Sequence, residues 1–315
     1  MIAVLNSCKD PFFNQALEEY VFRNITGEDV FLLWQNQPCV VVGSFQNIHR
    51  EVDVLALEKE HIAVVRRMTG GGAVYHDLGN FNYSLIFDGA EALDYDRCLE
   101  PMLAALRGMG LNVCRDRVCD IALDGRKISG SAQRLEKGRL LHHGTLLFQS
   151  DLEVLDRITT KNKNAFISSR GTESAICRVT NISDYLPEPM DADTFRMRLL
   201  DALVPDAGKR VALGENERVE ISRLMREKYQ SHAWTWGRTP PYVYSREAVF
   251  CARPIRIWYQ ARKGIITRAD IRSELLLPEA GGKLVGCPID PDSLRAACRR
   301  IAGAERAEEL LLVLL

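Results

Sequence analysis

The sequence predicts an α+β fold, with mainly antiparallel sheets flanked by helices and a small C-terminal α+β accessory domain. Helix-like and strand-like segments alternate along the chain, but they do not form regular strand–helix–strand units. Instead, the dipeptides Asp124-Gly125 and Lys137-Gly138 indicate tight hairpins. Because a tight hairpin joins two antiparallel strands, these turns favour an antiparallel sheet.

The first part of the chain is expected to begin with a helix and to continue with short strands. Asp10 is placed to cap a helix that starts at Pro11, and apolar residues then recur with helical spacing. The following patterns predict strands over 31–35, 39–43, 62–66 and 81–89, and helices over 52–61 and 94–110.

The second part begins with short strands between residues 112 and 149. The polar segment 159–173 is predicted to be a mobile loop, and helical patterns follow at 191–203 and 215–230. The aromatic and proline-rich stretch 234–244 is typical of a domain boundary. We therefore expect two domains, 1–245 and 246–315, and the smaller one carries strand-like residues and two short helices at 290–302 and 304–315.

Composition excludes several classes of protein. The 315 residues are 46% hydrophobic and 26% charged, as in globular proteins, and their formal net charge is −1. This balance argues against a nucleic-acid partner held by a strongly basic surface. The longest apolar runs fall far short of the ~20 residues that span a bilayer, so no membrane association is expected. Nine cysteines without CxxC spacing argue against a zinc site or a disulfide framework and favour the reducing cytoplasm.

The glycine segment, residues 66–75, carries the clearest chemical signal. Three consecutive glycines, Gly70–Gly72, are costly unless the backbone must turn sharply or approach a ligand, and their N–H groups can form an anion-binding nest. Arg66 and Arg67 add positive charge suited to phosphate or carboxylate. No Lys-Ser/Thr follows the glycines, and Tyr75 stands where GxGxxG needs glycine, so neither common nucleotide fingerprint fits. A flexible hairpin loop with incidental arginines is the alternative.

A second cluster lies on a predicted strand around Lys127. Alternation would place Lys127, Ser129 and Ser131 on one face, and Ile128, Ala132 and the gap left by Gly130 on the other. A lysine beside small residues leaves room for a ligand, and its ammonium can hold a carboxylate and a phosphate together. The alternative is a solvated lysine on an edge strand.

His142 and His143 form a third cluster. Because neighbours on a strand face opposite ways, the two rings cannot share a metal ion through one face. One histidine is expected to be structural, and the other to line a pocket; no metal site is predicted.

These segments resemble those of the lipoate–protein ligases, which are relatives of biotin ligases and octanoyl transferases. The similar segments are 66–80 (RRMTGGGAVYHDLGN), 127–133 (KISGSAQ), 142–147 (HHGTLL) and 171–182 (GTESAICRVTNI). The resemblance extends from residue 1 to about 245, and a small accessory domain beyond that point is typical of the ligases. The glycine and lysine motifs together are more specific than either alone.

The resemblance implies the fold of the biotin and lipoyl ligases and an ATP-dependent ligase reaction in two steps. Lipoate would attack the α-phosphate of ATP, with Mg²⁺ on the phosphates, to give lipoyl-adenylate, and a lysine of a lipoyl domain would then take the lipoyl group. The implied acceptors are the E2 subunits of 2-oxoacid dehydrogenases and the H protein of glycine cleavage. Lys127 would be the catalytic residue and would contact both ATP and lipoate. The other implied ATP-binding residues are Arg67, Gly72, Ala73, Val74 and Tyr75, and further pocket candidates are Gly70, Gly71, His76, Asn80, Asp120 and His143.

The chain departs from the family pattern at Cys119, which takes the place of an asparagine, and at 269–271 in the accessory domain. The closest rival function is a transferase of the same superfamily that carries octanoyl or lipoyl as a thioester on Cys114 or Cys119. A biotin ligase and a non-catalytic lipoyl-domain binder fit the combined motifs less well.

Overall fold

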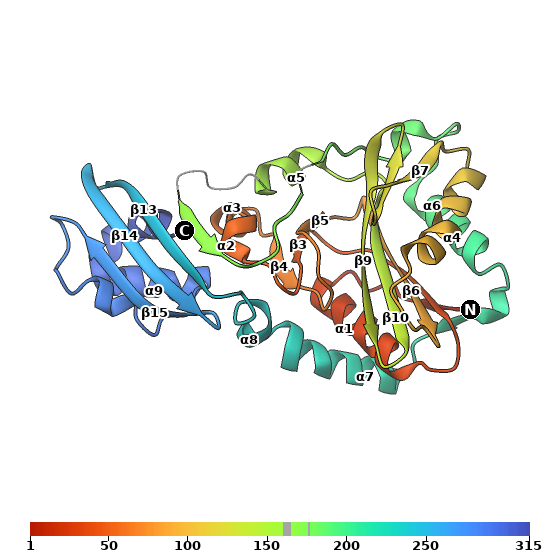
Figure 1. The fold of residues 1–315 in the computed structure, drawn as a ribbon, viewed down its shortest axis with the longest axis horizontal. Coiled ribbons are helices and arrows are strands. Elements are labelled where there is room, and N and C mark those ends of the chain that lie inside the picture. The colour runs from red at the N-terminus through yellow and green to blue at the C-terminus, as the bar shows by residue number, and fades with distance from the viewer. Residues whose placement is uncertain (160–164, 176) are drawn as a thin grey trace.

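A computed structural model describes residues 1–159, 165–175 and 177–315 (Figure 1). Within these residues, three sheets carry the fold, and most of their neighbouring strands are antiparallel. The strands are β1 (Ile2–Leu5), β2 (Val30–Trp34), β3 (Cys39–Val42), β4 (Ala63–Arg66), β5 (Val74–His76), β6 (Asn80–Asp88), β7 (Val113–Asp116), β8 (Asp120–Leu123), β9 (Arg126–Glu136), β10 (Arg139–Leu147), β11 (Phe166–Ser169), β12 (Arg210–Ala212), β13 (Tyr242–Phe250), β14 (Arg253–Arg262) and β15 (Ile265–Arg272).

Helices cover these sheets from both sides and at the ends (Figure 1). The α-helices are α1 (Pro11–Asn24), α2 (Ile48–Glu51), α3 (Val54–Lys59), α4 (Tyr95–Gly108), α5 (Leu152–Thr159), α6 (Ala192–Leu203), α7 (Glu215–Leu224), α8 (His232–Thr235), α9 (Pro291–Ala302) and α10 (Ala307–Leu314). A π-helical turn, Met225–Tyr229, extends α7. None of the helices in the described ranges is both long and apolar enough to cross a membrane.

The largest sheet has eight strands in the order β12-β1-β2-β6-β10-β9-β8-β7. The pairs β1–β2 and β1–β12 are parallel and the other neighbours are antiparallel. Helices α4 and α6 pack on one face, around Phe81 and Phe195, while α1 and the end of α7 cover the other. Asp10 caps α1 as predicted, because its carboxylate accepts from the amides of Phe12 and Phe13.

The predicted hairpins are confirmed at both glycine dipeptides. Asp124 and Gly125 have φ values of 47° and 76°, and Lys137 and Gly138 have 52° and 75°. Two successive positive φ values define the hairpin turns that match the twist of antiparallel strands. These turns join β8 to β9 and β9 to β10, and so build the half of the sheet that carries the lysine cluster.

A three-stranded sheet, β4-β3-β5, lies beside the large sheet and holds the glycine segment between β4 and β5. Helices α2 and α3 pack on it through Ile48, Val54 and Leu57, and Ile158 of α5 joins the same cluster. The glycines therefore lie in the connection between β4 and β5, and the sheet that holds these two strands is covered by helices on one face.

The third sheet, β11-β13-β14-β15, is antiparallel and packs on α9 and α10. Its edge strand β11 comes from within the segment 159–173, so the prediction of a mobile loop is wrong for Phe166–Ser169. These four residues pair with β13, and Ile167 packs against the core of this sheet. Local composition could not predict this pairing, because the partner strand lies more than 70 residues away. Residues 160–164 of that prediction lie outside the described residues.

Candidate active site

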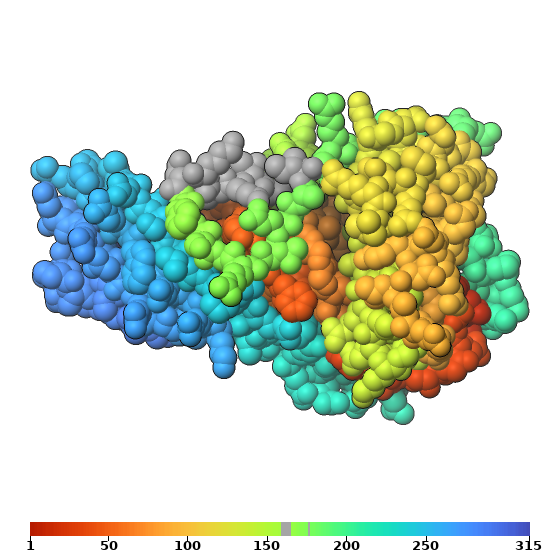
Figure 2. All heavy atoms as spheres, in the orientation of Figure 1, coloured from red at the N-terminus to blue at the C-terminus, as the bar shows by residue number. Residues whose placement is uncertain are grey.

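Two adjoining cavities lie between the glycine segment and strands β9 and β10. The first is bounded by residues that include Trp34, Arg67, His76, Asn82, Asp120, Ala132 and His143. The second is bounded by residues that include Glu51, Tyr75, Arg126, Leu152, Asp156 and Arg178. Seven residues line both cavities: Ala73, Val74, Lys127, Gly130, Thr145, Ser174 and Ala175. Figure 2 shows a hollow between the orange glycine segment and the yellow strands, with the green chain that follows β11 beside it.

Arg67 lies under the glycine segment and fixes its shape. Its guanidinium donates to the carbonyl oxygens of Gly70 (2.6 Å), Gly72 (2.7 Å) and Val41 (3.0 Å). The side chain is largely buried, and burial lowers its pKa to about 10, so it stays charged at neutral pH. Because the carbonyls of Gly70 and Gly72 point toward Arg67, the N–H groups across the same trans peptide bonds, those of Gly71 and Ala73, point the other way. Among the described residues, no acceptor is bonded to the amides of Gly70–Gly72.

Arg66 does not take part in the site. Its fully buried guanidinium donates to the backbone oxygens of Gly43, Gln46 and Thr235 and to the hydroxyl of Thr239. The expectation that both arginines face an anionic ligand is therefore wrong for Arg66. Neighbours on a strand point to opposite faces, and Arg66 is the last residue of β4.

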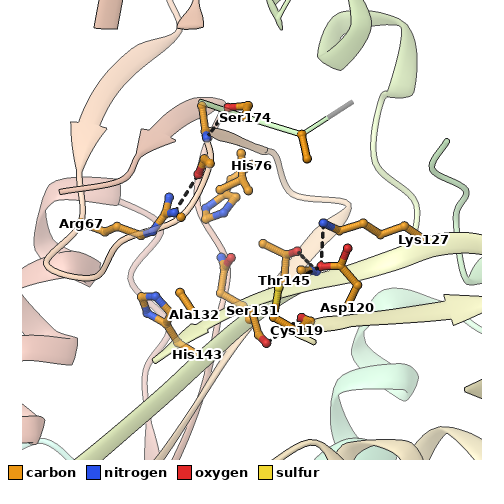
Figure 3. A pocket seen from close by; sticks show the side chains of 18 of the residues that line it. Arg67, His76, Cys119, Asp120, Lys127, Ser131, Ala132, His143, Thr145 and Ser174 are labelled. Carbon is orange, nitrogen blue, oxygen red and sulfur yellow. Dashed lines mark hydrogen bonds and ion pairs between the residues drawn. The ribbon is translucent and has the colours of Figure 1, made fainter. Parts of the chain in front are cut away.

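Lys127 reaches the border between the cavities and forms an ion pair with Asp120, at 2.9 Å between Nζ and Oδ1 (Figure 3). The prediction that Lys127 and Ser129 share a face is wrong. β9 shifts its register against β8 at this point, and the shift breaks the alternation of side chains. Ser129 is buried, and a Cβ at Gly130 would lie 2.7 Å from the lysine Nζ. Gly130, not Ser129, therefore leaves the room that the ammonium occupies.

The two adjacent histidines face opposite ways, as predicted. His143 lines the first cavity, where its ring bonds the hydroxyl of Thr69 (2.7 Å) and the carboxylate of Glu18 (2.8 Å). His142 is fully buried against Tyr83, and burial lowers its pKa to about 3. His143 is thus the histidine at the pocket.

His76 also lines the first cavity, with its Nδ1 atom 3.1 Å from the side-chain nitrogen of Asn36. Burial, together with the nearby charge of Arg67, lowers its pKa to about 3. His76 is therefore a neutral imidazole at physiological pH.

The other predicted residues are distributed unevenly around the site. Gly71, Gly72, Ala73, Val74 and Asp120 line the first cavity. Tyr75 lines only the second cavity, and its largely buried side chain packs on the three-stranded sheet. Gly70 and Asn80 line neither cavity; the amide of Asn80 donates to Asn82, which does line the first one.

Sequence reasoning missed Ser174 as a site residue. Its hydroxyl oxygen accepts from the amide of Ala73 at 2.9 Å, and a Cβ on Gly72 would lie 3.1 Å from that oxygen. The motif at 171–182 was the available signal, but only the fold brings it against the glycine segment. Trp34 was missed for the same reason, because it comes from β2 of the large sheet.

The two cysteines of the rival thioester function are placed differently. Cys114 is exposed and lines neither cavity. Cys119 lines the first cavity, but burial and the carboxylate of Asp120, 3.5 Å from its sulfur, raise the pKa of the thiol. A raised pKa disfavours the thiolate that a thioester mechanism needs.

Comparison with known proteins shows the family to which this chain belongs. The family model for the lipoyl protein ligase A/B catalytic domain matches residues 10–204. Lipoate–protein ligase 1 of Staphylococcus aureus is 34% identical over 93% of this chain and 91% of its own length, and the lipoate–protein ligase LplJ of Bacillus subtilis is 37% identical over 82% and 80%. The solved structure of P. falciparum LipL1 in complex with lipoate covers 99% of this chain and 98% of its own, with a TM-score of 0.64 at 19% identity, and so shares the fold. The predicted α+β class is confirmed, and the chain belongs to the lipoate–protein ligase family.

Proposed function

We propose that this protein is an ATP-dependent lipoate–protein ligase. One observation carries the proposal: two cavities meet at Lys127 and at the glycine segment. Among the described residues, the backbone amides of Gly70–Gly72 have no acceptor. An enzyme that joins an acid to a nucleotide needs two binding sites with a common, positively polarised border. Lys127 and the glycine segment supply that border.

The first cavity suits the lipoyl group and the second suits the nucleotide. Trp34 and Ala132 offer apolar surface to an acyl chain in the first cavity. Arg126 and Arg178 line only the second cavity, where their exposed guanidinium groups can hold phosphates. With the substrates placed this way, the lipoate carboxylate meets the α-phosphate beside Lys127.

The first step transfers the adenylyl group to lipoate. A carboxylate oxygen of lipoate forms a bond to the α-phosphorus, and the bond from that phosphorus to the β-phosphate oxygen breaks, so that pyrophosphate leaves. In the second step the neutral ε-amine of an acceptor lysine attacks the acyl carbon; AMP leaves and the nitrogen loses a proton. Neither step needs a protein nucleophile, so positioning and charge neutralisation dominate.

Mg²⁺ fits this site as a partner of the phosphates. Within the described part of the chain, no three His, Cys, Asp or Glu side chains are grouped to hold a metal. Magnesium commonly binds substrate phosphates and water with only one or two carboxylates. Asp156 lines the second cavity and Asp120 the first, so either could supply a carboxylate there. The ion would neutralise phosphate charge.

The acceptors we propose are lipoyl domains of 2-oxoacid dehydrogenase E2 subunits and the glycine cleavage H protein. Lipoate–protein ligases in other organisms are the relatives that support this choice. We place the reaction in the cytoplasm, because all nine cysteines are unpaired. We also propose residues 1–245 as the catalytic domain and 246–315 as the accessory domain, although β11 and the start of β13 attach the accessory sheet to residues before this division.

Transfer to an acceptor tests the function. Purified protein is incubated with ATP, Mg²⁺, lipoate and a lipoyl domain, and the mass of the acceptor domain is measured by mass spectrometry. We expect the mass of one lipoyl group to be added, only when ATP is present, and equally well by the Cys114→Ser and Cys119→Ser variants. Transfer from a lipoyl thioester without ATP, lost in a cysteine variant, would instead support the transferase.

A further inference from the structure

The border between the cavities contains a hydroxyl group whose hydrogen-bonding capacity is incompletely used. The bond between lipoate and the α-phosphorus has to form where the two cavities meet. Among the described residues that line both cavities, the side chains with hydrogen-bond donors are Lys127, Thr145 and Ser174. Of the two hydroxyl groups, only that of Ser174 accepts from two donors and is thereby fixed in direction. We propose that the Ser174 hydroxyl donates a hydrogen bond to one non-bridging oxygen of the α-phosphate. This inference rests on the proposed function.

The contacts of Ser174 leave only its hydrogen free. A serine hydroxyl has two lone pairs and one hydrogen. The amide of Ala73 donates to Ser174 Oγ at 2.9 Å, and the side-chain nitrogen of Gln46 donates to it at 3.1 Å. Both lone pairs are therefore used, and the described residues offer the hydroxyl hydrogen no acceptor.

The orientation of the Gln46 amide follows from its other contact. Its Oε1 atom accepts from the backbone amide of Gly43 at 2.9 Å, and a backbone N–H can only donate. The atom that faces Ser174 is therefore the nitrogen, which can only donate as well. Since Ala73 also presents an N–H, Ser174 cannot direct its hydrogen to either neighbour.

The segment that carries Ser174 is held in place from several sides. The backbone amide of Ser174 donates to the buried carboxylate of Glu51 at 3.0 Å. Arg50 donates to the carbonyl oxygens of Ser169 (3.2 Å) and Gly171 (2.6 Å). These contacts fix the hydroxyl before substrate arrives, which lowers the entropic cost of using it.

The glycine segment shows the same close fit from the opposite side. A Cβ on Gly72 would lie 3.1–3.3 Å from Ser174, so a larger residue would displace the serine. Figure 3 shows Ser174 bonded to the glycine segment, while Lys127 approaches from the strand. A neutral donor and an ammonium would then hold different oxygens of one phosphate. Ser174 transfers no proton and fixes the phosphate in place.

The test compares adenylation by wild type and Ser174→Ala. Lipoate-dependent exchange of labelled pyrophosphate into ATP measures the first step alone. Loss of one hydrogen bond to a charged phosphate should slow exchange about 10- to 100-fold. Ser168→Ala is the matched control, because Ser168 lies on β11, is exposed and lines neither cavity. Exchange at the wild-type rate in Ser174→Ala would overturn the proposal.

A second measurement distinguishes a hydrogen bond from Ser174 to the α-phosphate from a purely structural role of Ser174 in holding the glycine segment. The two diastereomers of ATP with sulfur on the α-phosphorus differ in which non-bridging oxygen is replaced, and sulfur is a poor acceptor. If Ser174 bonds one of these oxygens, the rate ratio of the diastereomers should change about tenfold between wild type and Ser174→Ala. Any preference set by Mg²⁺ is common to both enzymes and cancels. An unchanged ratio would show that Ser174 only fastens the loop, and would overturn the proposal.

Gln46→Glu provides a variant that keeps the serine. The carboxylate can still accept from Gly43, but it now offers Ser174 an acceptor in place of a donor. We expect it to capture the hydroxyl hydrogen and shift the diastereomer ratio in the same direction as Ser174→Ala. A ratio that stays at the wild-type value would contradict the assigned hydrogen-bond direction. If wild type shows no lipoate-dependent exchange, the proposed function itself fails; normal wild-type exchange with unchanged ratios in both variants refutes only the role of Ser174.

Discussion

The guanidinium of Arg67 is buried and bonds backbone carbonyls and the hydroxyl of Thr69. That it also binds the nucleotide stays a prediction. Its charge lies next to the first cavity, while its donors hold the carbonyls of Gly70 and Gly72, so that the N–H groups of Gly71 and Ala73 point away from it. The arginine therefore serves an anion site mainly by positioning the backbone around it.

Arg67→Lys tests this role at the residue scale. Lysine keeps the charge, but it cannot bond the carbonyls of Val41, Gly70 and Gly72 in one plane. We expect the free energy of unfolding to fall by about 2–4 kcal/mol, because buried acceptors lose their partners, and adenylation to fall with it. Urea unfolding and pyrophosphate exchange measure the two effects, and Arg262→Lys, at an exposed position of β14, is the control. Unchanged stability would mean that the forked geometry is dispensable.

Lys127→Ala should separate catalysis from stability when combined with Asp120→Asn. Without the ammonium, the buried carboxylate of Asp120 loses its partner, and stability should fall by about 1–3 kcal/mol. Neutralising Asp120 in the same chain should restore most of that loss. Adenylation should remain at least ~100-fold below wild type in both variants, because no other charged side chain of the described residues lines both cavities. A double variant that regains activity would remove Lys127 from the reaction.

At the scale of elements, the sequence predicted most of the large sheet and the approximate position of the site. Helix α1 and the hairpins around β9 carry local signals, a capping aspartate and positive-φ dipeptides, and these were read correctly. The register shift of β9 was not predicted, because it depends on the fit between two strands and not on one strand's alternation. For the same reason Ser174 and Trp34 were missed: contacts distant in sequence bring them to the cavities.

Strand β11 offers a test at this scale. Its pairing with β13 predicts that those amides of residues 166–169 that donate to β13 exchange with solvent more slowly than unpaired amides. Ile167→Pro should abolish that protection, since proline cannot donate to the ladder and its ring disturbs an edge strand that packs on the core. Hydrogen exchange read by mass spectrometry follows the segment, with Ser168→Ala as the control. Fast exchange of residues 166–169 in wild type would refute the pairing.

At the scale of the whole molecule, the accessory sheet is joined to the rest by packing as well as by the chain. His49 of α2 lies buried between the two parts, with its ring 5.6 Å from that of Trp236 and 6.1 Å from that of Tyr242. Arg295 of α9 pairs with Glu58 of α3, and Leu315 packs beside the three-stranded sheet. Protonation of His49 would place a charge inside this interface.

Stability should therefore fall on acidification. Burial lowers the pKa of His49 to about 4, below its value near 6.5 in an unfolded chain. Between these values the unfolded state binds more protons, so stability is complete above pH 6.5 and decreases as the pH falls toward 4. At pH 5 the loss from His49 is about 2 kcal/mol. Urea unfolding from pH 7.5 to 5 should be less pH-dependent in His49→Gln and unchanged in exposed His61→Asn. Equal pH dependence in wild type and His49→Gln would contradict this assignment.

A crystal structure with a non-hydrolysable lipoyl-adenylate analogue tests most directly whether the two cavities form one bipartite site. We expect the acyl chain in the first cavity near Trp34, the adenosine in the second, and the anionic linkage within hydrogen-bonding distance of Lys127 Nζ. An analogue bound with its linkage away from Lys127 and the glycine segment, or with both of its ends in one cavity, would contradict the proposed site.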